Sequence, residues 1–257
     1  MTLAAATTPD STGILDVRAG WTQGRGAYGG LVVGSLVRAI EQRVGEPDRA
    51  VRSVTAELLA PLPVGPAQIA VEVLRRGNNV TIARAAIAGY AHVVAVLAAA
   101  RSAGGEGKAA VGWQDLAPPE APPFDALPEV AAPGPEFIQH FDVRVARGFP
   151  LGGGTETVGW LRARAPGEAR DAAYIAAMID AWYPVALVRL PAFRPMATLA
   201  FTLDIVGGAA GLAPDAPLLY RATAPVCTDG YALETRELWT ADGRLVAINQ
   251  QTFVVFA

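Results

Sequence analysis

The sequence predicts an α+β fold of two similar units, each with an antiparallel sheet wrapped around a long buried helix. The same order, a helix followed by a run of strands, occurs twice in the 257 residues. Both helical segments are apolar nearly all round, and a helix without a polar face is buried. Between the units lies a proline-rich segment, residues 104–135. It is typical of a linker, because proline breaks helices and cannot donate to a β-ladder.

The first unit, residues 1–103, is predicted to begin its helix after Gly29-Gly30 and to end it where the sequence turns polar, at Glu41-Gln42-Arg43. Strands are expected at 53–59, 67–74, 80–87 and 92–99. Arg76-Gly77-Asn78-Asn79 is predicted to be a hairpin turn, since glycine and asparagine tolerate positive φ. This alternation of short strands and turns indicates antiparallel pairing.

The second unit, residues 136–257, repeats this plan. A strand at 157–164 is expected to lead to a helix at 169–182, which Pro184 stops. Further strands are expected at 198–206, 218–225, 231–240 and 245–255. Helix-then-strands order argues against a parallel βαβ sheet, which alternates the two. A sheet wrapped around a central helix is the hot-dog arrangement, so the prediction is a tandem, or double, hot dog.

The composition excludes several classes of protein. A net charge of −3 provides no field for gathering nucleic acid. Cys227 is the only cysteine, so an intrachain disulfide or a cysteine-based zinc cluster is impossible. The longest apolar run, 93–100, is too short to span a bilayer, and the first residues lack the pattern of a signal peptide. We therefore expect a cytoplasmic protein without a membrane span, a metal or a cofactor.

Several familiar motifs are absent or incomplete. Gly24 to Gly29 spells G-x-G-x-x-G, but no strand directly precedes it and hairpins follow it, which argues against dinucleotide binding. Neither His92 nor His140 has the spacing of a catalytic triad, and nothing basic neighbours Cys227. The chain also has no Gly-x-Ser-x-Gly nucleophile elbow. These patterns give no support to covalent catalysis.

Two polar features interrupt apolar segments. Asp180 lies late in the second predicted helix, and burying an unpaired carboxylate costs several kcal/mol. It either faces solvent at the outer end of the helix or points inward as a functional group, and a wrapped helix favours the second interpretation. In the last strand, alternation puts Asn249 and Gln251 on one face and Gln250 on the other. The pair on one face indicates a polar-lined pocket.

The chain as a whole, from about Trp21 to Val255, resembles the acyl-CoA thioesterase II family of double hot-dog thioesterases. The motifs that carry this resemblance are listed here in chain order: Tyr28-Gly29-Gly30-Leu31-Val32-Val33-Gly34, the stretch from Val51 to Pro61, the hairpin from Leu74 to Asn79, Asp180-Ala181-Trp182-Tyr183-Pro184 and the closing stretch from Asp242 to Gln251. Their order and spacing cover most of the chain.

The resemblance implies a catalytic set of an aspartate, a hydroxyl residue and a glutamine that together hold a water. These carry over to Asp180, to Thr198 and to Gln251. Thr202 is a second candidate for the hydroxyl, and Gln250 differs from Gln251 by one step of strand register. The implied reaction is the hydrolysis of acyl-CoA thioesters.

For this reaction Asp180 is expected to act as the base or to orient the water. Backbone N–H groups near Gly29 and Gly30 are expected to bind the substrate carbonyl, as helix N-termini do. Trp182 and Tyr183 are expected to line an acyl tunnel. Two alternatives stay open: a hot-dog hydratase or dehydratase, which would use an Asp/His pair, and a non-catalytic acyl-CoA binding protein. The family also suggests a homodimer or a higher homo-oligomer.

Overall fold

The computed structural model describes residues 1–101, 113–130, 134–207, 211–213 and 215–256. Part of the predicted linker, 104–112 and 131–133, lies outside the described residues. Among those described, no helix has the length and apolar character needed to cross a membrane.

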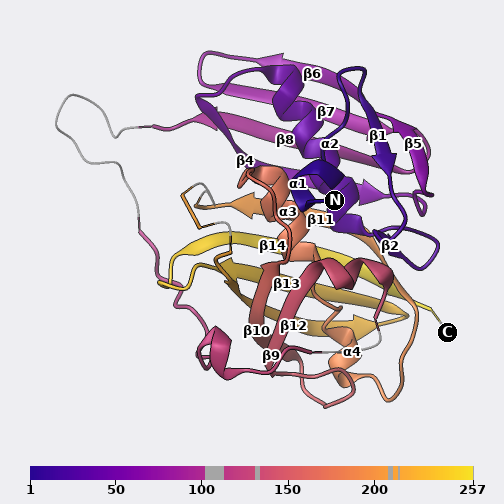
Figure 1. Ribbon diagram of the computed structural model, residues 1–257, viewed down its shortest axis with the longest axis vertical. Coiled ribbons are helices and arrows are strands. Elements are labelled where there is room, and N and C mark those ends of the chain that lie inside the picture. Colours follow the sequence, from indigo (N-terminus) through magenta and orange to yellow (C-terminus); the bar gives the residue numbers. More distant parts are fainter. Residues whose placement is uncertain (102–112, 131–133, 208–210, 214, 257) are drawn as a thin grey trace.

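One large antiparallel sheet dominates the fold (Figure 1), with the strand order β6-β7-β8-β4-β11-β14-β13-β12-β10-β9. The first half of the chain supplies β4 (Arg49–Leu58), β6 (Ala70–Arg76), β7 (Val80–Ile87) and β8 (Ala91–Ala99). The second half supplies β9 (Phe141–Arg147), β10 (Glu156–Ala163), β11 (Met196–Ile205), β12 (Leu218–Thr228), β13 (Tyr231–Trp239) and β14 (Leu245–Val255).

The two halves meet where β4 pairs with β11, with Thr55 opposite Thr202. The prediction of two sheets was therefore wrong in this respect, because the strands join into one. The physical reason is that β4 and β11 would each be an edge strand of its own half, and pairing satisfies their outer N–H and C=O groups.

Smaller elements surround this sheet. They are α1 (Leu3–Ala6), β1 (Ile14–Val17), β2 (Thr22–Gln23), β3 (Gly26–Ala27), β5 (Gly65–Gln68), the 3₁₀ turns η1 (Phe124–Ala126) and η2 (Glu136–His140), and the short helix α4 (Ala186–Arg189). Of these, β1 pairs with β5 and β2 with β3.

The two main helices are α2 (Gly29–Val44) and α3 (Ala172–Asp180), which pack against each other. The second helix is shorter than predicted. It begins at the N-cap Asp171, whose side chain accepts a hydrogen bond from the Tyr174 N–H. Arg38 of α2 also donates hydrogen bonds to both carboxylate oxygens of Asp171, including Nη2 to Oδ1 at 2.7 Å and Nε to Oδ2 at 3.0 Å. The start of α3 is thereby fixed to α2.

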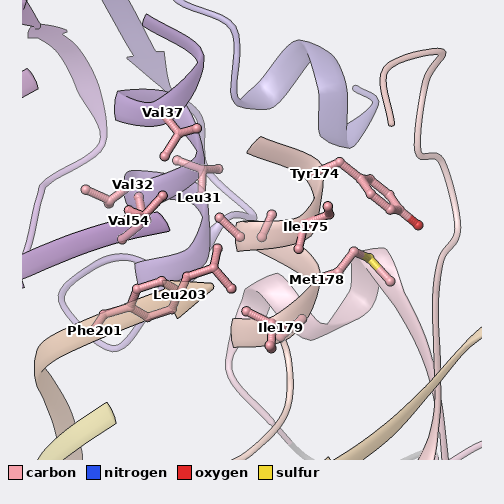
Figure 2. Close-up of a cluster of buried hydrophobic side chains, with 14 of the residues drawn as sticks. Leu31, Val32, Val37, Val54, Tyr174, Ile175, Met178, Ile179, Phe201 and Leu203 are labelled. Carbon is pink, nitrogen blue, oxygen red and sulfur yellow. The ribbon is translucent and has the colours of Figure 1, made fainter. Parts of the chain in front are cut away.

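Apolar side chains fill the space between the helices and the sheet. Figure 2 shows Leu31, Val32 and Val37 of α2 and Tyr174, Ile175, Met178 and Ile179 of α3, together with Val54 of β4 and Phe201 and Leu203 of β11. Two glycines let the helices approach. A Cβ added at Gly30 would lie 2.8 Å from the Asp180 Cβ, and one added at Gly34 would lie 2.8 Å from the Ala173 carbonyl oxygen.

Candidate active site

Asp180 is the last residue of α3, and its side chain is only 8% exposed. Its Oδ1 accepts a hydrogen bond of 2.8 Å from the Gln251 side-chain amide. The Arg236 guanidinium lies 3.4 Å from the same oxygen. The carboxylate is thus turned into the protein, between α3 and the sheet.

Gln251, on β14, connects three polar side chains. Its Nε2 donates to Asp180 and, at 2.9 Å, to Asn249 Oδ1. Its Oε1 accepts a hydrogen bond of 3.0 Å from the Thr198 hydroxyl of β11. Both N–H groups and the carbonyl of this amide are therefore used, and its orientation is fixed by the network.

The structure separates these residues from the two alternatives. Gln250 is exposed, as strand alternation requires, and the Thr202 hydroxyl is directed at the Gln250 backbone oxygen. Thr198 and Thr202 would share one face of a regular strand, but the pairing of β11 with β14 shifts between Thr198 and Ala200. This irregularity lets Thr198 reach Gln251 while Thr202 does not.

Two charged residues of the cluster were not predicted from the sequence. Arg236 and Glu234 lie on β13 with side chains that are 1% and 0% exposed, and Arg236 Nη2 is 3.0 Å from Glu234 Oε2. The strand pairing sets Arg236 opposite Asn249 and Glu234 opposite Gln251. In the sequence, Glu234 and Arg236 occupy every second position together with the apolar residues Ala232 and Leu238, and therefore share one face of the strand. This spacing could have grouped them, but it does not tell which face of the strand is buried.

Burial raises the pKa of Asp180 above its ordinary value, because desolvation disfavours the charged form. Three contacts oppose this change in pKa: the charge of Arg236, the hydrogen bond from Gln251 and the backbone N–H of Gly30. The site thus holds an acid that takes up a proton more readily than an exposed aspartate does.

The first turn of α2 lies directly against this acid. A Cβ added at Gly29 would be 2.8 Å from Asp180 Oδ2, so a side chain there would displace the carboxylate. The Tyr28 hydroxyl, one residue earlier, donates to the Ala177 carbonyl at 3.1 Å and fixes this turn to α3. The first turn of α2 is thus packed closely against the carboxylate of Asp180.

Trp182 and Tyr183 make contacts inside the second half. Trp182 is 2% exposed, stacks on Tyr220 at a ring distance of 4.6 Å and donates to the Thr157 hydroxyl. The Tyr183 hydroxyl donates to the Gly148 carbonyl at 2.6 Å. These contacts account for both side chains as packing and hydrogen-bonding groups, and their role in binding an acyl chain stays a prediction.

The residues of other catalytic designs lie elsewhere. His92 is paired with Glu57 at 2.6 Å, and His140 stacks on the Trp21 ring and contacts a backbone oxygen. Cys227 is exposed. None of these three side chains makes a described contact with the acid of α3.

The fold and the cluster together define a hot-dog protein with a buried acid, amide and hydroxyl beside a helix N-terminus. Family models for the acyl-CoA thioesterase N-terminal domain and C-terminal domain match residues 17–103 and 114–255. The chain belongs to the acyl-CoA thioesterase family and is a thioester hydrolase.

Solved structures share this fold along nearly the whole chain. A conserved protein with a hot-dog fold from Alicyclobacillus acidocaldarius is 24% identical with a TM-score of 0.83, over 99% of this chain and 98% of that one. The acyl-CoA thioesterase II TesB2 from Mycobacterium marinum is 24% identical with a TM-score of 0.71, over 89% of this chain and 88% of that one. A search of curated proteins finds no match.

Proposed function

We propose that the chain hydrolyses acyl-CoA thioesters with a water that Asp180, Thr198 and Gln251 position. The observation that supports this proposal is the hydrogen-bond chain from Thr198 through Gln251 to Asp180, in a nearly buried site at the N-terminus of α2. The thioesterase family sets the reaction, and this chain of contacts suggests the groups that perform it.

In the proposed reaction Asp180 accepts a proton from water while the water oxygen attacks the thioester carbonyl. Gln251 holds the carboxylate with one N–H and is itself held by the Thr198 hydroxyl. Because that hydroxyl donates its proton to Gln251, its lone pairs remain able to accept from the attacking water. The carbon–sulfur bond then breaks, and CoA leaves as a thiolate that needs no dedicated general acid, because a thiol has an ordinary pKa of about 8.5.

The carbonyl oxygen gains negative charge during the attack. The N-terminus of α2 is the group suited to stabilise it, since its first N–H groups point out of the helix at the positive end of the helix dipole. We assign this role to the backbone N–H groups at Gly29 and Gly30, the first two residues of α2. Trp182 and Tyr183, which follow Asp180 closely in the chain, are proposed to contact the acyl chain.

The alternative of a hydratase or dehydratase is compatible with the fold. The dehydratase domain of RzxB from Pseudomonas fluorescens is similar in structure to this chain, with a TM-score of 0.52 and 14% sequence identity. Such chemistry would use a histidine with the aspartate, whereas His92 and His140 are engaged with other groups. This observation favours hydrolysis over hydration.

The variant Asp180→Asn tests the proposal. Thiol release from acyl-CoAs of increasing chain length would be followed with a thiol reagent, and the variant is expected to lose about 10²–10⁴ in turnover. Asp204→Asn is the matched control, because Asp204 is exposed on β11. Near-normal turnover by Asp180→Asn would remove Asp180 from the mechanism. Binding of acyl-CoA by the unaltered protein without thiol release would support the binding protein instead.

A further inference from the structure

The acid of the candidate site belongs to a larger buried group of charges. Asp180, Arg236 and Glu234 have side chains that are 8%, 1% and 0% exposed. Arg236 lies between the two carboxylates, 3.4 Å from Asp180 Oδ1 and 3.0 Å from Glu234 Oε2. Burying charged side chains costs free energy, so two carboxylates and one guanidinium buried together here indicate a functional role.

We propose that Arg236 and Glu234 are positioning residues, which set both the orientation and the ionisation of Asp180. The inference rests on the proposed function, in which Asp180 is the base. It adds two residues of β13 that the thioester itself does not need to touch.

The orientation follows from the contacts of each residue. Arg236 Nη1 donates to the Ile179 carbonyl at 3.2 Å, at the end of α3, and so fixes the turn that carries Asp180. Glu234 Oε1 accepts from the Ala186 N–H at 3.1 Å, in the first turn of α4. The guanidinium is therefore held by Glu234, and Glu234 is held by α4.

The ionisation follows from the balance of charges. With all three groups ionised the cluster would carry one net negative charge, and burial raises the pKa of both Asp180 and Glu234. The other titratable groups that face Asp180 are Tyr28, before α2, and Tyr220, on β12; burial raises the pKa of both phenols, so they stay neutral.

Among the described residues, Arg236 is the cation that favours the carboxylate form of Asp180. Glu234 has the opposite effect, because it adds a negative charge and competes for the same guanidinium. The two residues therefore act on Asp180 in opposite directions.

This opposition gives a test that a merely structural role would not pass. The test measures kcat/KM against pH and follows the acid limb, the part of the profile where activity falls as Asp180 becomes protonated. Arg236→Met is expected to move this limb to higher pH by about 1–3 units, the usual effect of losing a neighbouring opposite charge. Glu234→Gln keeps the shape of the side chain and removes its charge, so its acid limb should move downward. Arg236→Lys should return the limb toward that of the unaltered protein.

Removing one partner of a buried ion pair is strongly destabilising, so the double variant Arg236→Met/Glu234→Gln supplies a second comparison. Its acid limb should lie above that of Glu234→Gln alone, since the cation is gone. The matched control is Arg221→Met. Arg221 pairs with Glu237 at 2.7 Å, and Glu237 lies on the same strand, β13, but on its opposite face.

The control should leave the acid limb where it is. Limbs that stay in place in the Arg236 and Glu234 variants, or that move in the same direction, would overturn the inference. The Asp180→Asn activity separately decides whether Asp180 is the base. A carboxyl ¹³C titration of Asp180, assigned with that variant, reports the same opposite shifts without relying on turnover.

Discussion

Replacing Gly30 by alanine is expected to force α2 away from α3 and to displace Asp180. An added Cβ would lie 2.6 Å from Tyr28 Cε2, 2.8 Å from Asp180 Cβ and 3.0 Å from the Ala177 carbonyl oxygen. Non-bonded carbon atoms prefer separations of about 3.5–4.0 Å, so the surroundings must move by roughly 1 Å. None of these three atoms is the far end of a flexible side chain, so the strain is not easily relieved.

The magnitude of the effect has two parts. Overpacking of this kind costs about 1–3 kcal/mol in the free energy of unfolding. A displacement of about 1 Å at a catalytic group costs about 10²-fold in rate. We therefore expect Gly30→Ala to lose modest stability in urea denaturation and about two orders of magnitude in turnover, measured as thiol release where the variant is fully folded.

Gly34→Ala separates these two parts. Its Cβ would lie 2.8 Å from the Ala173 carbonyl oxygen, which is a comparable clash at the other end of α3 from Asp180. It should lose similar stability and much less turnover. Equal losses of turnover in the two variants, or unaltered turnover in Gly30→Ala, would refute the reasoning that Gly30 makes room for the acid.

Three further outcomes are expected. Thr198→Val leaves the Gln251 carbonyl oxygen without its donor, which costs about 1–3 kcal/mol, so thiol release should fall about 10–100-fold, whereas the outward Thr202→Val should not change it. Tyr220→Phe should raise the free energy of unfolding in urea by about 1 kcal/mol, because the fully buried hydroxyl of Tyr220 has no hydrogen-bond partner among the residues that the structure describes. Burial, and to a smaller extent the nearby carboxylate of Asp171, raises the pKa of Glu41 from 4.5 to about 7. Between these two pH values the native state holds a proton on Glu41 that the unfolded state has lost. The free energy of unfolding should therefore fall by up to about 3 kcal/mol as pH rises from 4.5 to 7. Urea denaturation at several pH values should show this slope, and Glu41→Gln should flatten it.

Much of the fold follows from local patterns in the sequence. The apolar segment after Gly29-Gly30 is α2, and the alternating segments of both halves are strands. The second helix was predicted to extend three residues too far at its start and two at its end, although Asp171 is a residue type that favours the N-cap. β9 was not predicted, although Phe141, Val143 and Val145 alternate. Its Asp142 is buried because Arg144 and Arg162 pair with it, and such a pairing depends on tertiary structure.

The site was harder to predict than the fold. Asp180 and Gln251 stand out because each is polar in an apolar segment. The choice between Thr198 and Thr202 depends on an irregularity in strand pairing, which a period of two does not reveal. Arg236 was missed because its burial depends on the register between β13 and β14 and on the position of α3 over them.

The two ends of the paired helices show why the cluster forms at one of them. At the start of α3, Asp171 caps its own helix and is held by Arg38, so that helix N-terminus is closed by a paired side chain. At the start of α2, Gly29 and Gly30 leave the helix N-terminus open to Asp180. The proposed acid, amide and hydroxyl all come from residues 136–257, but the helix end that they face comes from residues 1–103. The predicted division into two units therefore cuts through the candidate site, and a change at Gly30, outside the half that carries Asp180, is expected to alter the proposed chemistry of that acid.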